Sequence, residues 1–269
     1  MSAPLLEARG IWKRYGAVQA LRSVNLTVHG GEVHCLLGDN GAGKSSLIKV
    51  LSGVIPSDEG EILVDGEEAD FRGPQDALDE GIATVFQDLA VVPILPVFRN
   101  FFLGREPTKG WGPFRRFDVR EAEQHTRAAL HEVGIDLEDV RRPAMTLSGG
   151  QRQCVAIAKA MHFGAKVLIL DEPTSALGVR QSGIVLEYVL QARAKGLGIV
   201  LITHNVQHAL PVGDSFTILK RGEASGPFGR EDLGADDLTH LMGGGEELDV
   251  LAARLAGARS DSQQVRGSS

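Results

Sequence analysis

A glycine-rich loop, flanked by a strand pattern and a helix pattern, constrains the fold of this chain more than any other feature. The loop spans residues 38–45 and reads Gly-Asp-Asn-Gly-Ala-Gly-Lys-Ser. The preceding segment 31–37 is largely apolar, whereas the apolar residues of 44–51 recur at helical spacing. A loop between a strand and a helix can wrap an anion with backbone N–H groups at the positive end of the helix dipole. These patterns favour a phosphate cradle over an ordinary glycine turn with an exposed lysine.

The side chains of the loop predict which anion binds. Lys44 would bridge the β- and γ-phosphates of a nucleoside triphosphate, and the Ser45 hydroxyl would ligate Mg²⁺. Gly41 and Gly43 would let the backbone approach the phosphates closely. We therefore expect ATP and Mg²⁺ to bind here. The residues expected to hold ATP in this loop are Gly38, Asp39, Asn40, Gly41, Ala42, Gly43, Lys44, Ser45 and Ser46.

Two adjacent carboxylates, Asp171 and Glu172, follow an uninterrupted apolar run at 167–170. Such a run is typical of a strand that is buried on both faces, and ligands of open parallel sheets bind at the carboxyl ends of strands. Asp171 would hold the Mg²⁺ shell through water, and Glu172 would polarise the attacking water. A simple helix cap predicts one acid there rather than two. His204 follows a second β-branched strand pattern at 198–203, which would end at the same edge.

Composition limits what kind of protein this is. The 269 residues can form one large domain or two modest ones, and a net charge of −7 argues against a nucleic-acid partner. The two cysteines, Cys35 and Cys154, are far apart and lack metal-ligand spacing, which suggests a reduced, cytosolic protein. The longest apolar stretch, 89–98, is too short to span a bilayer. We expect a cytosolic protein unless a partner anchors it.

A second glycine motif precedes an alanine-rich helix pattern at 154–160. The run 147–153 reads Leu-Ser-Gly-Gly-Gln-Arg-Gln and would place another anion site at a helix N-terminus, without a lysine. A glycine turn that merely caps a core helix is the alternative. This run resembles the signature sequence of ABC-type ATPases, which contacts the γ-phosphate held by a second subunit. The residues that the resemblance places in trans are Ser148, Gly149, Gly150 and Gln151.

The resemblance extends over about residues 5–242 and implies roles for residues that spacing alone leaves unassigned. Tyr15 matches the aromatic residue that stacks on adenine. Gln87 matches the glutamine that touches Mg²⁺ and links the site to a membrane partner. Glu172 matches the catalytic carboxylate, and His204 matches the histidine that senses the γ-phosphate. Lys44 and Gln87 complete the catalytic set that the family implies.

The expected fold is α/β, with a P-loop NTPase (RecA-like) core, an N-terminal antiparallel β subdomain and an inserted α-helical subdomain. The β subdomain would use alternating segments at 5–28 and 61–71, with a turn at 58–60. The expected divisions are 1–87 for the β subdomain and the first part of the core, 88–164 for the helical subdomain with the signature, 165–245 for the rest of the core, and 246–269 for a disordered tail that could hold a short helix at 248–255.

One position departs from the family pattern, because Gly178 stands where an aspartate most often reaches across the dimer. This puts communication between the two ATP sites in doubt. The segments 81–89, 99–104 and 175–179 resemble the ATP-binding subunits of bacterial monosaccharide importers of the single-unit fructose or ribose type. Gly178 fits that group better than the family at large. Nothing in these residues reads a sugar.

The resemblance implies two macromolecular contacts, a second copy of the chain in an ATP-sandwich homodimer and an integral membrane permease. The permease would dock near Gln87 and 98–103, at the cytoplasmic face of the inner membrane, and would receive its sugar from a periplasmic or extracellular binding protein. The segment 89–103 is too apolar to lie wholly in water, so part of it must be buried in the core or against a partner. For a partner, the expected anchors are Phe98, Phe101 and Phe102.

The leading hypothesis is therefore an ATP hydrolase that drives sugar import. An alternative is an ATP-gated clamp or regulator of the same superfamily that is not coupled to transport. Such proteins usually have a long coiled-coil insertion or two fused units, and neither pattern is present. A GTPase is a weaker alternative, because the chain has no Asn-Lys-x-Asp motif.

Overall fold

The computed structural model describes residues 3–132, 134, 135 and 137–243. Within this part of the chain the larger sheet has six strands in the order β12-β11-β3-β10-β9-β6. All neighbours are parallel except β11 and β12. The strands are β3 (Val33–Leu37), β6 (Ile82–Val85), β9 (Val167–Asp171), β10 (Gly198–Thr203), β11 (Ser215–Lys220) and β12 (Glu223–Gly229). The predicted tail at 246–269, and the short helix that it could hold at 248–255, lie outside the described residues.

The register of the large sheet brings the predicted ligands to one edge. Thr203 of β10 lies opposite Leu37 of β3, and Ile202 lies opposite Asp171 of β9. The carboxyl ends of these three strands therefore meet where the 38–45 loop begins. Parallel strands with covered faces need apolar residues at every position, which explains the uninterrupted run at 167–170.

A smaller antiparallel sheet, of four strands in the described residues, has the order β2-β1-β4-β5. Its strands are β1 (Pro4–Tyr15), β2 (Val18–His29), β4 (Glu59–Val64) and β5 (Glu67–Glu68). The predicted turn at 58–60 is wrong, because Glu59 and Gly60 belong to β4. Gly60 has φ 92°, and a Cβ there would lie 2.4 Å from the carbonyl oxygen of Gly10, so only glycine allows this approach of β4 to β1.

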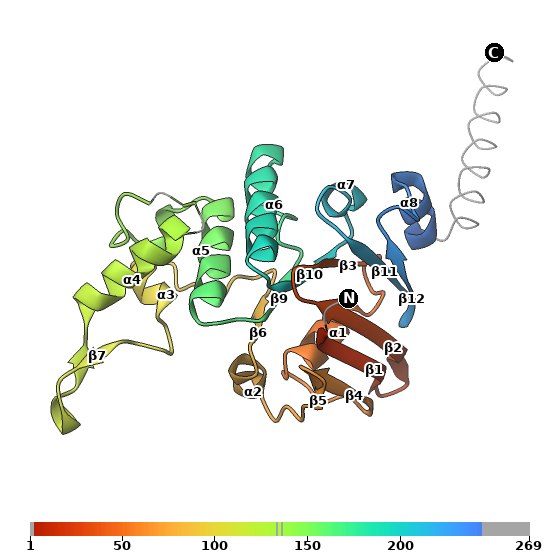
Figure 1. The fold of residues 1–269 in the computed structure, drawn as a ribbon, viewed down its shortest axis with the longest axis horizontal. Coiled ribbons are helices and arrows are strands. Elements are labelled where there is room, and N and C mark those ends of the chain that lie inside the picture. Colours follow the sequence, from red (N-terminus) through yellow and green to blue (C-terminus); the bar gives the residue numbers. More distant parts are fainter. Residues whose placement is uncertain (1–2, 133, 136, 244–269) are drawn as a thin grey trace, which may run out of the picture.

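Helices cover both faces of the large sheet (Figure 1). In that view α6, α7 and α8 lie above it, while α1 and the antiparallel sheet lie below. The helices are α1 (Lys44–Leu51), α2 (Pro74–Asp79), α3 (Val97–Phe101), α4 (Val119–Glu132), α5 (Gly149–His162), α6 (Val179–Ala194), α7 (Val206–Ala209) and α8 (Ala235–Gly243). None of the helices in the described ranges is both long and apolar enough to cross a membrane.

Successive side chains of a strand point to opposite faces of the large sheet and pack in two different hydrophobic cores. Val167 and Ile169 of β9 pack in the core shared with α1 and the antiparallel sheet. Leu168 and Leu170 of the same strand pack in the other core, with α5, α6 and the helical segment after β6. The sheet is thus the common wall of both cores, which fixes the strand ends that form the site.

Phe98, Phe101 and Phe102 lie in this second core, with exposures of 4%, 0% and 4%. Phe101 and Phe102 pack on the rings of His162 and Phe163 at the end of α5. Of the two alternatives for the segment 89–103, burial in the core therefore holds for these three phenylalanines, and the expectation that they would anchor a partner is wrong, since their side chains are buried within the chain itself. Their apolar character instead holds α3 against α5.

Candidate nucleotide site

The glycine loop enters α1 in a conformation that other residues cannot adopt. Gly43 is the N-cap of α1 with φ 113°, and the described residues give this cap no side-chain hydrogen bond. A Cβ at Gly43 would lie 2.5 Å from the carbonyl oxygen of Ala20, and one at Gly38 would lie 2.3 Å from that of Leu219. The loop lies between β2 and β11, and within the described residues no side chain caps the first N–H groups of α1. This is the geometry that an anion at a helix N-terminus requires.

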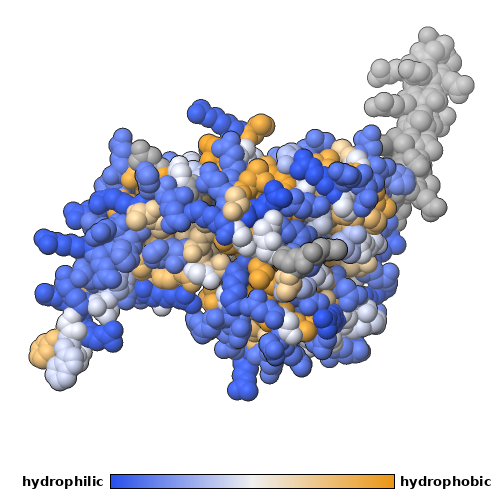
Figure 2. Space-filling model, viewed as in Figure 1, coloured by the Kyte–Doolittle hydropathy of each residue, from blue (hydrophilic) through white to orange (hydrophobic). Residues whose placement is uncertain are grey.

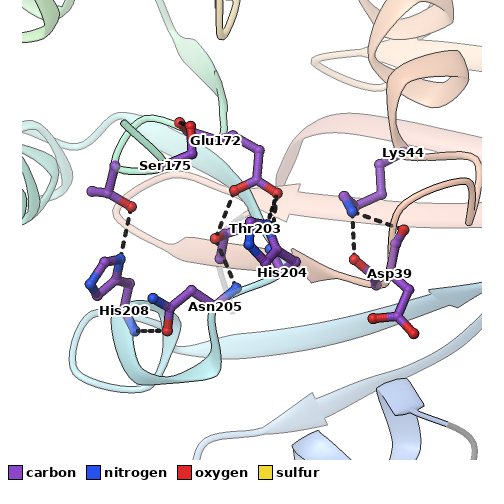
Figure 3. A network of polar contacts seen from close by, with 10 residues as sticks. Asp39, Lys44, Glu172, Ser175, Thr203, His204, Asn205 and His208 are labelled. Atoms are coloured by element: carbon purple, nitrogen blue, oxygen red, sulfur yellow. Dashed lines mark hydrogen bonds and ion pairs between the residues drawn. The ribbon is translucent and has the colours of Figure 1, made fainter. Parts of the chain in front are cut away.

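Lys44 lies at the start of α1 and is only 7% exposed. Its Nζ donates to the carbonyl oxygens of Gly38 (2.5 Å) and Asp39 (3.1 Å), as Figure 3 shows. Burial lowers the pKa of Lys44, while the charges of Glu172, Asp171 and Asp39 act in the opposite direction. Both hydrogen bonds of Lys44 go to neutral carbonyl groups. A bound triphosphate would give the Lys44 ammonium group an anionic partner, and hydrogen bonds between charged groups are stronger.

Glu172 lies just after β9 in the left-handed region, with φ 47°, which is uncommon for a residue other than glycine. Its carboxylate accepts hydrogen bonds from Thr203 Oγ1 (3.1 Å), the His204 backbone N–H (3.0 Å) and His204 Nδ1 (2.7 Å). Figure 3 shows the carboxylate pointing toward Thr203 and His204. The strained backbone therefore turns Glu172 toward β10, where three donors fix its orientation.

Asp171, the last residue of β9, has a different environment from its neighbour. Burial raises the pKa of Asp171, the adjacent Glu172 charge raises it further, and Lys44 partly offsets both. A half-buried carboxylate beside another acid is stabilised by a cation, and Mg²⁺ prefers oxygen ligands of this kind. The donor set at this edge therefore fits a magnesium ion.

Sequence reasoning did not identify Thr203, although it joins two parts of the site. Its hydroxyl donates to Glu172 and accepts a hydrogen bond from the Asn205 backbone N–H at 3.0 Å. Asn205 in turn caps α7, accepting from the N–H groups of Gln207 and His208. A buried hydroxyl at the end of an apolar strand, one residue before His204, is the signal that could have found it.

Gln87 lies two residues beyond β6 and is exposed. It lines a cavity of about 490 Å³ together with Glu172 and Gly149. The structure therefore brings the predicted Gln87 and Glu172 to one cavity.

The signature segment forms the N-terminus of α5. Ser148 is the N-cap, its Oγ accepts from the Gln151 backbone N–H (3.2 Å), and the Gln151 side chain accepts from the Ser148 N–H (3.0 Å). Gly149 and Gly150 approach Leu177 and Gln181 so closely that an added Cβ would lie 2.7 and 3.3 Å from their side chains. Among the described residues, no hydrogen bond of 148–151 reaches the 38–45 loop. The structure therefore does not bring these residues to the loop of the same chain.

Tyr15 ends β1 and is 47% exposed. Tyr15 lies at the turn of the hairpin between β1 and β2. Ala20, near the start of β2, has its carbonyl group next to Gly43 of the glycine loop. An exposed aromatic ring on this hairpin is available to a planar base. Stacking of Tyr15 on adenine stays a prediction.

The fold and this edge of the sheet define the class of the protein. Residues 21–175 match the ABC transporter family. The chain is similar to a solved nucleotide-free ATP-binding cassette from an ABC transporter, with TM-score 0.73, 25% identity, and coverage of 83% of this chain and 90% of the other. The chain belongs to the ABC transporter family, whose ATP-binding domain binds nucleotide. The predicted α/β fold of the P-loop NTPase type is confirmed.

Within this family, the chain is most informatively compared with two curated relatives. The chain is 45% identical to the fructose import ATP-binding protein FrcA of Rhizobium meliloti, over 91% of this chain and 95% of the relative. It is 40% identical to the xylose/arabinose import ATP-binding protein XylG of Sulfolobus acidocaldarius, over 88% and 93%. The predicted resemblance to monosaccharide importer ATPases is confirmed.

Proposed function

We propose that this chain hydrolyses ATP to drive import of a monosaccharide through a partner permease. The observation that carries the proposal is the Glu172 carboxylate, held by Thr203 and His204 at the strand edge where Lys44 and the glycine loop lie. A carboxylate whose oxygens are fixed by three donors is oriented to take a proton from water attacking a γ-phosphate. His204 would contact that phosphate, and Lys44 would neutralise its charge.

Mg²⁺ is the cofactor of this proposal. When bound, it neutralises charge on the phosphate oxygens. The Ser45 hydroxyl and Gln87 would ligate it directly, and Asp171 would hold it through water. The raised pKa of Asp171 supports a cation at this position, because a charge nearby stabilises the ionised carboxylate.

The active form would be a homodimer that sandwiches two ATP molecules. The signature residues lie at the N-terminus of α5, and within the described residues they make no hydrogen bond with the 38–45 loop of their own chain. Ser148, Gly149, Gly150 and Gln151 would therefore complete the site of a second copy. Tyr15, Asp39 and Asn40, all exposed, would contact the nucleotide from the first copy.

A second, mostly apolar cavity of about 360 Å³ supports a permease contact. It lies between α2, β6, the segment after α3, and α5, and its lining includes Leu78, Phe86, Leu89 and Leu103. A short helix of a membrane protein would fit such a groove. The chain would then lie at the cytoplasmic face of the membrane, with a sugar-binding protein on the other side. Leu103, which is 43% exposed, replaces the buried phenylalanines as the expected anchor.

The curated relatives support the importer over the alternative of an ATP-gated clamp without transport. We place the boundaries of the helical subdomain at 87/88 and 164/165. The order of elements along the chain is consistent with these boundaries, since α3, α4 and α5 lie between β6 and β9. Closure of the dimer would move the helical part, at 88–164, relative to the two core segments, 1–87 and 165–245.

The test is the ATPase rate per subunit as a function of protein concentration, with Glu172→Gln as the control for contaminating activity. We expect the rate to rise with concentration, and the variant to lose about 10²–10⁴-fold while still binding ATP. A wild-type rate equal to that of the variant at every concentration would overturn hydrolysis by the isolated chain. Co-purification with a membrane permease from the native host then tests the transport role separately.

A further inference from the structure

A protruding hairpin exposes the two most accessible aromatic side chains in the described part of the chain. β7 (Thr108–Lys109) pairs with β8 (Arg116–Phe117), and the connecting loop carries Trp111 and Phe114, which are 88% and 81% exposed. Figure 2 shows the tip projecting from the lower left of the molecule, well away from the body. Aromatic rings of this size are normally buried on folding, so their exposure at a tip requires a separate explanation.

The tip is held in shape by hydrogen bonds within the hairpin. The Phe114 N–H donates to the carbonyl oxygen of Trp111 (3.1 Å), and the Arg115 guanidinium donates to Thr108 Oγ1 (2.8 Å). Gly110 has φ 103°, and a Cβ there would lie 2.5 Å from the carbonyl oxygen of Phe114. These contacts fix the backbone that carries both rings, which lowers the entropy cost of inserting the rings.

The base of the hairpin is fixed to the helical part. The Phe117 ring stacks on the buried Phe98 ring, with centroids 6.1 Å apart, and the Arg99 guanidinium lies 5.2 Å from the Phe117 centroid. Lys109 Nζ pairs with Asp118 at 3.2 Å. The aromatic tip thus projects from a packed support rather than from a loose loop.

The charge of the hairpin is opposite to that of the chain. Residues 108–117 contain Lys109, Arg115 and Arg116 but no acidic residue, in a protein of net charge −7. Arg115 and Arg116 are both exposed. Basic side chains beside exposed aromatic rings match an anionic lipid surface, where aromatic rings lie at headgroup level and cations meet phosphate groups.

We propose that the β7–β8 hairpin is a peripheral binding element for anionic phospholipid membranes. A convex tip with two protruding rings offers no pocket for a peptide, whereas a bilayer interface accepts such a shape. In Figure 1 the hairpin extends below α3 and α4, in the same downward direction in which α2 lies. Because α2 borders the cavity proposed for the permease, the hairpin points to the side where a membrane would be. The chemistry of the hairpin does not depend on ATP hydrolysis or on a permease.

Flotation of the purified chain with protein-free vesicles tests this. We expect binding to vesicles with about one third phosphatidylglycerol at low salt, and little binding to pure phosphatidylcholine. Trp111→Ala with Phe114→Ala should lower the partition coefficient at least about tenfold. Val54→Ala with Leu241→Ala, two exposed apolar residues elsewhere, should change it little. The unfolding temperatures of the wild-type chain and of the tip variant should be equal, because the replaced tip residues are exposed.

Charge and insertion are tested with separate variants. Arg116→Gln should weaken binding about fivefold, since each cation contributes about 1 kcal/mol near an anionic surface, whereas Arg127→Gln, at an exposed position elsewhere, should have less effect. Lipids brominated in the acyl chain should quench the fluorescence of Trp111, and Trp111→Phe should keep vesicle binding but lose the quenching. Failure of the wild-type chain to bind anionic vesicles would overturn the proposal. Binding only to vesicles that contain the permease would overturn it in favour of a protein contact.

Discussion

At the scale of single residues, the adjacent carboxylates Asp171 and Glu172 have different roles because their surroundings differ. Glu172 is turned by a left-handed backbone onto three hydrogen-bond donors, whereas Asp171 remains half-buried in the strand with a raised pKa. A carboxyl whose pKa is raised by folding stabilises the protein at low pH and loses this contribution as pH rises from about 4 through its folded pKa. Asp171 therefore destabilises the nucleotide-free protein at neutral pH.

Asp171→Asn should consequently raise the free energy of unfolding of the nucleotide-free protein by about 1 kcal/mol at pH 7. The same change should remove most of the stabilisation given by Mg²⁺ with ATP. Thermal unfolding between pH 5 and 8, with and without nucleotide, measures both effects. Asp70→Asn, at an exposed position, is the matched control and should change neither. If the Asp171 variant were less stable without nucleotide, the carboxylate would have a net favourable partner in the folded chain.

At the scale of elements, α6 begins without the usual cap. Gly178 is its N-cap with extended backbone, and within the described residues it has neither a side-chain hydrogen bond nor an acidic residue in the first helical turn. A Cβ at Gly178 would meet no described atom within 4 Å, so a larger residue fits. The position is thus open to the aspartate that the family usually has.

Gly178→Asp should stabilise the chain by a few tenths of a kcal/mol, because aspartate caps a helix and suits its positive end. Gly178→Ala should instead destabilise it slightly, since alanine is a poor cap. Urea unfolding measures both, with the alanine variant as the matched control. If the aspartate also acts across the dimer, half of the maximal ATPase rate should be reached at a lower protein concentration. Equal stability of the two variants would show that capping at Gly178 is unimportant.

Elements with local signals could be predicted from the sequence, and those fixed by distant contacts could not. The strand at 198–203 has the predicted bounds, and the helix that was expected to begin at Lys44 begins there, because glycines and apolar patterns mark these positions. The segment 58–60 has the local pattern of a turn, but its strand β4 depends on pairing with β1, some fifty residues earlier, and the sequence carries no local signal of that pairing. The strands of the β7–β8 hairpin are only two residues long each, too short for a periodic pattern.

The meeting of the strand ends that carry Asp171, Glu172 and His204 beside the 38–45 loop was predictable, because parallel strands end at one edge of a sheet. The hydrogen bonds within this edge were not predictable. The bonds of Glu172 to Thr203 and His204 span more than thirty residues and depend on the backbone turn at Glu172. The roles of Tyr15 and Ser148 remain predictions, because they concern a nucleotide and a second copy.

On the scale of the whole molecule, one hydrophobic core joins the large sheet to the helical part. Cys35 of β3 and Cys154 of α5 both belong to it and are 0% and 2% exposed. Burial raises the pKa of the Cys154 thiol to about 12, and burial, with the nearby Asp214 and Glu32 charges, raises that of Cys35 well above its usual range. Since the thiolate is the reactive form, neither cysteine should react in the folded protein.

If that core unfolds as one unit, both thiols should be labelled at the same rate, and only as fast as the protein opens. Labelling at pH 8 with a thiol reagent, followed by peptide mass analysis, gives the two rates separately. Mg²⁺ with ATP at about 100 times its Kd should slow both about a hundredfold, because ligand binding disfavours the open state. Faster labelling of Cys154 alone would show that the helical part opens by itself. The helical subdomain would then have its own stability, which is what a part that moves during dimer closure requires.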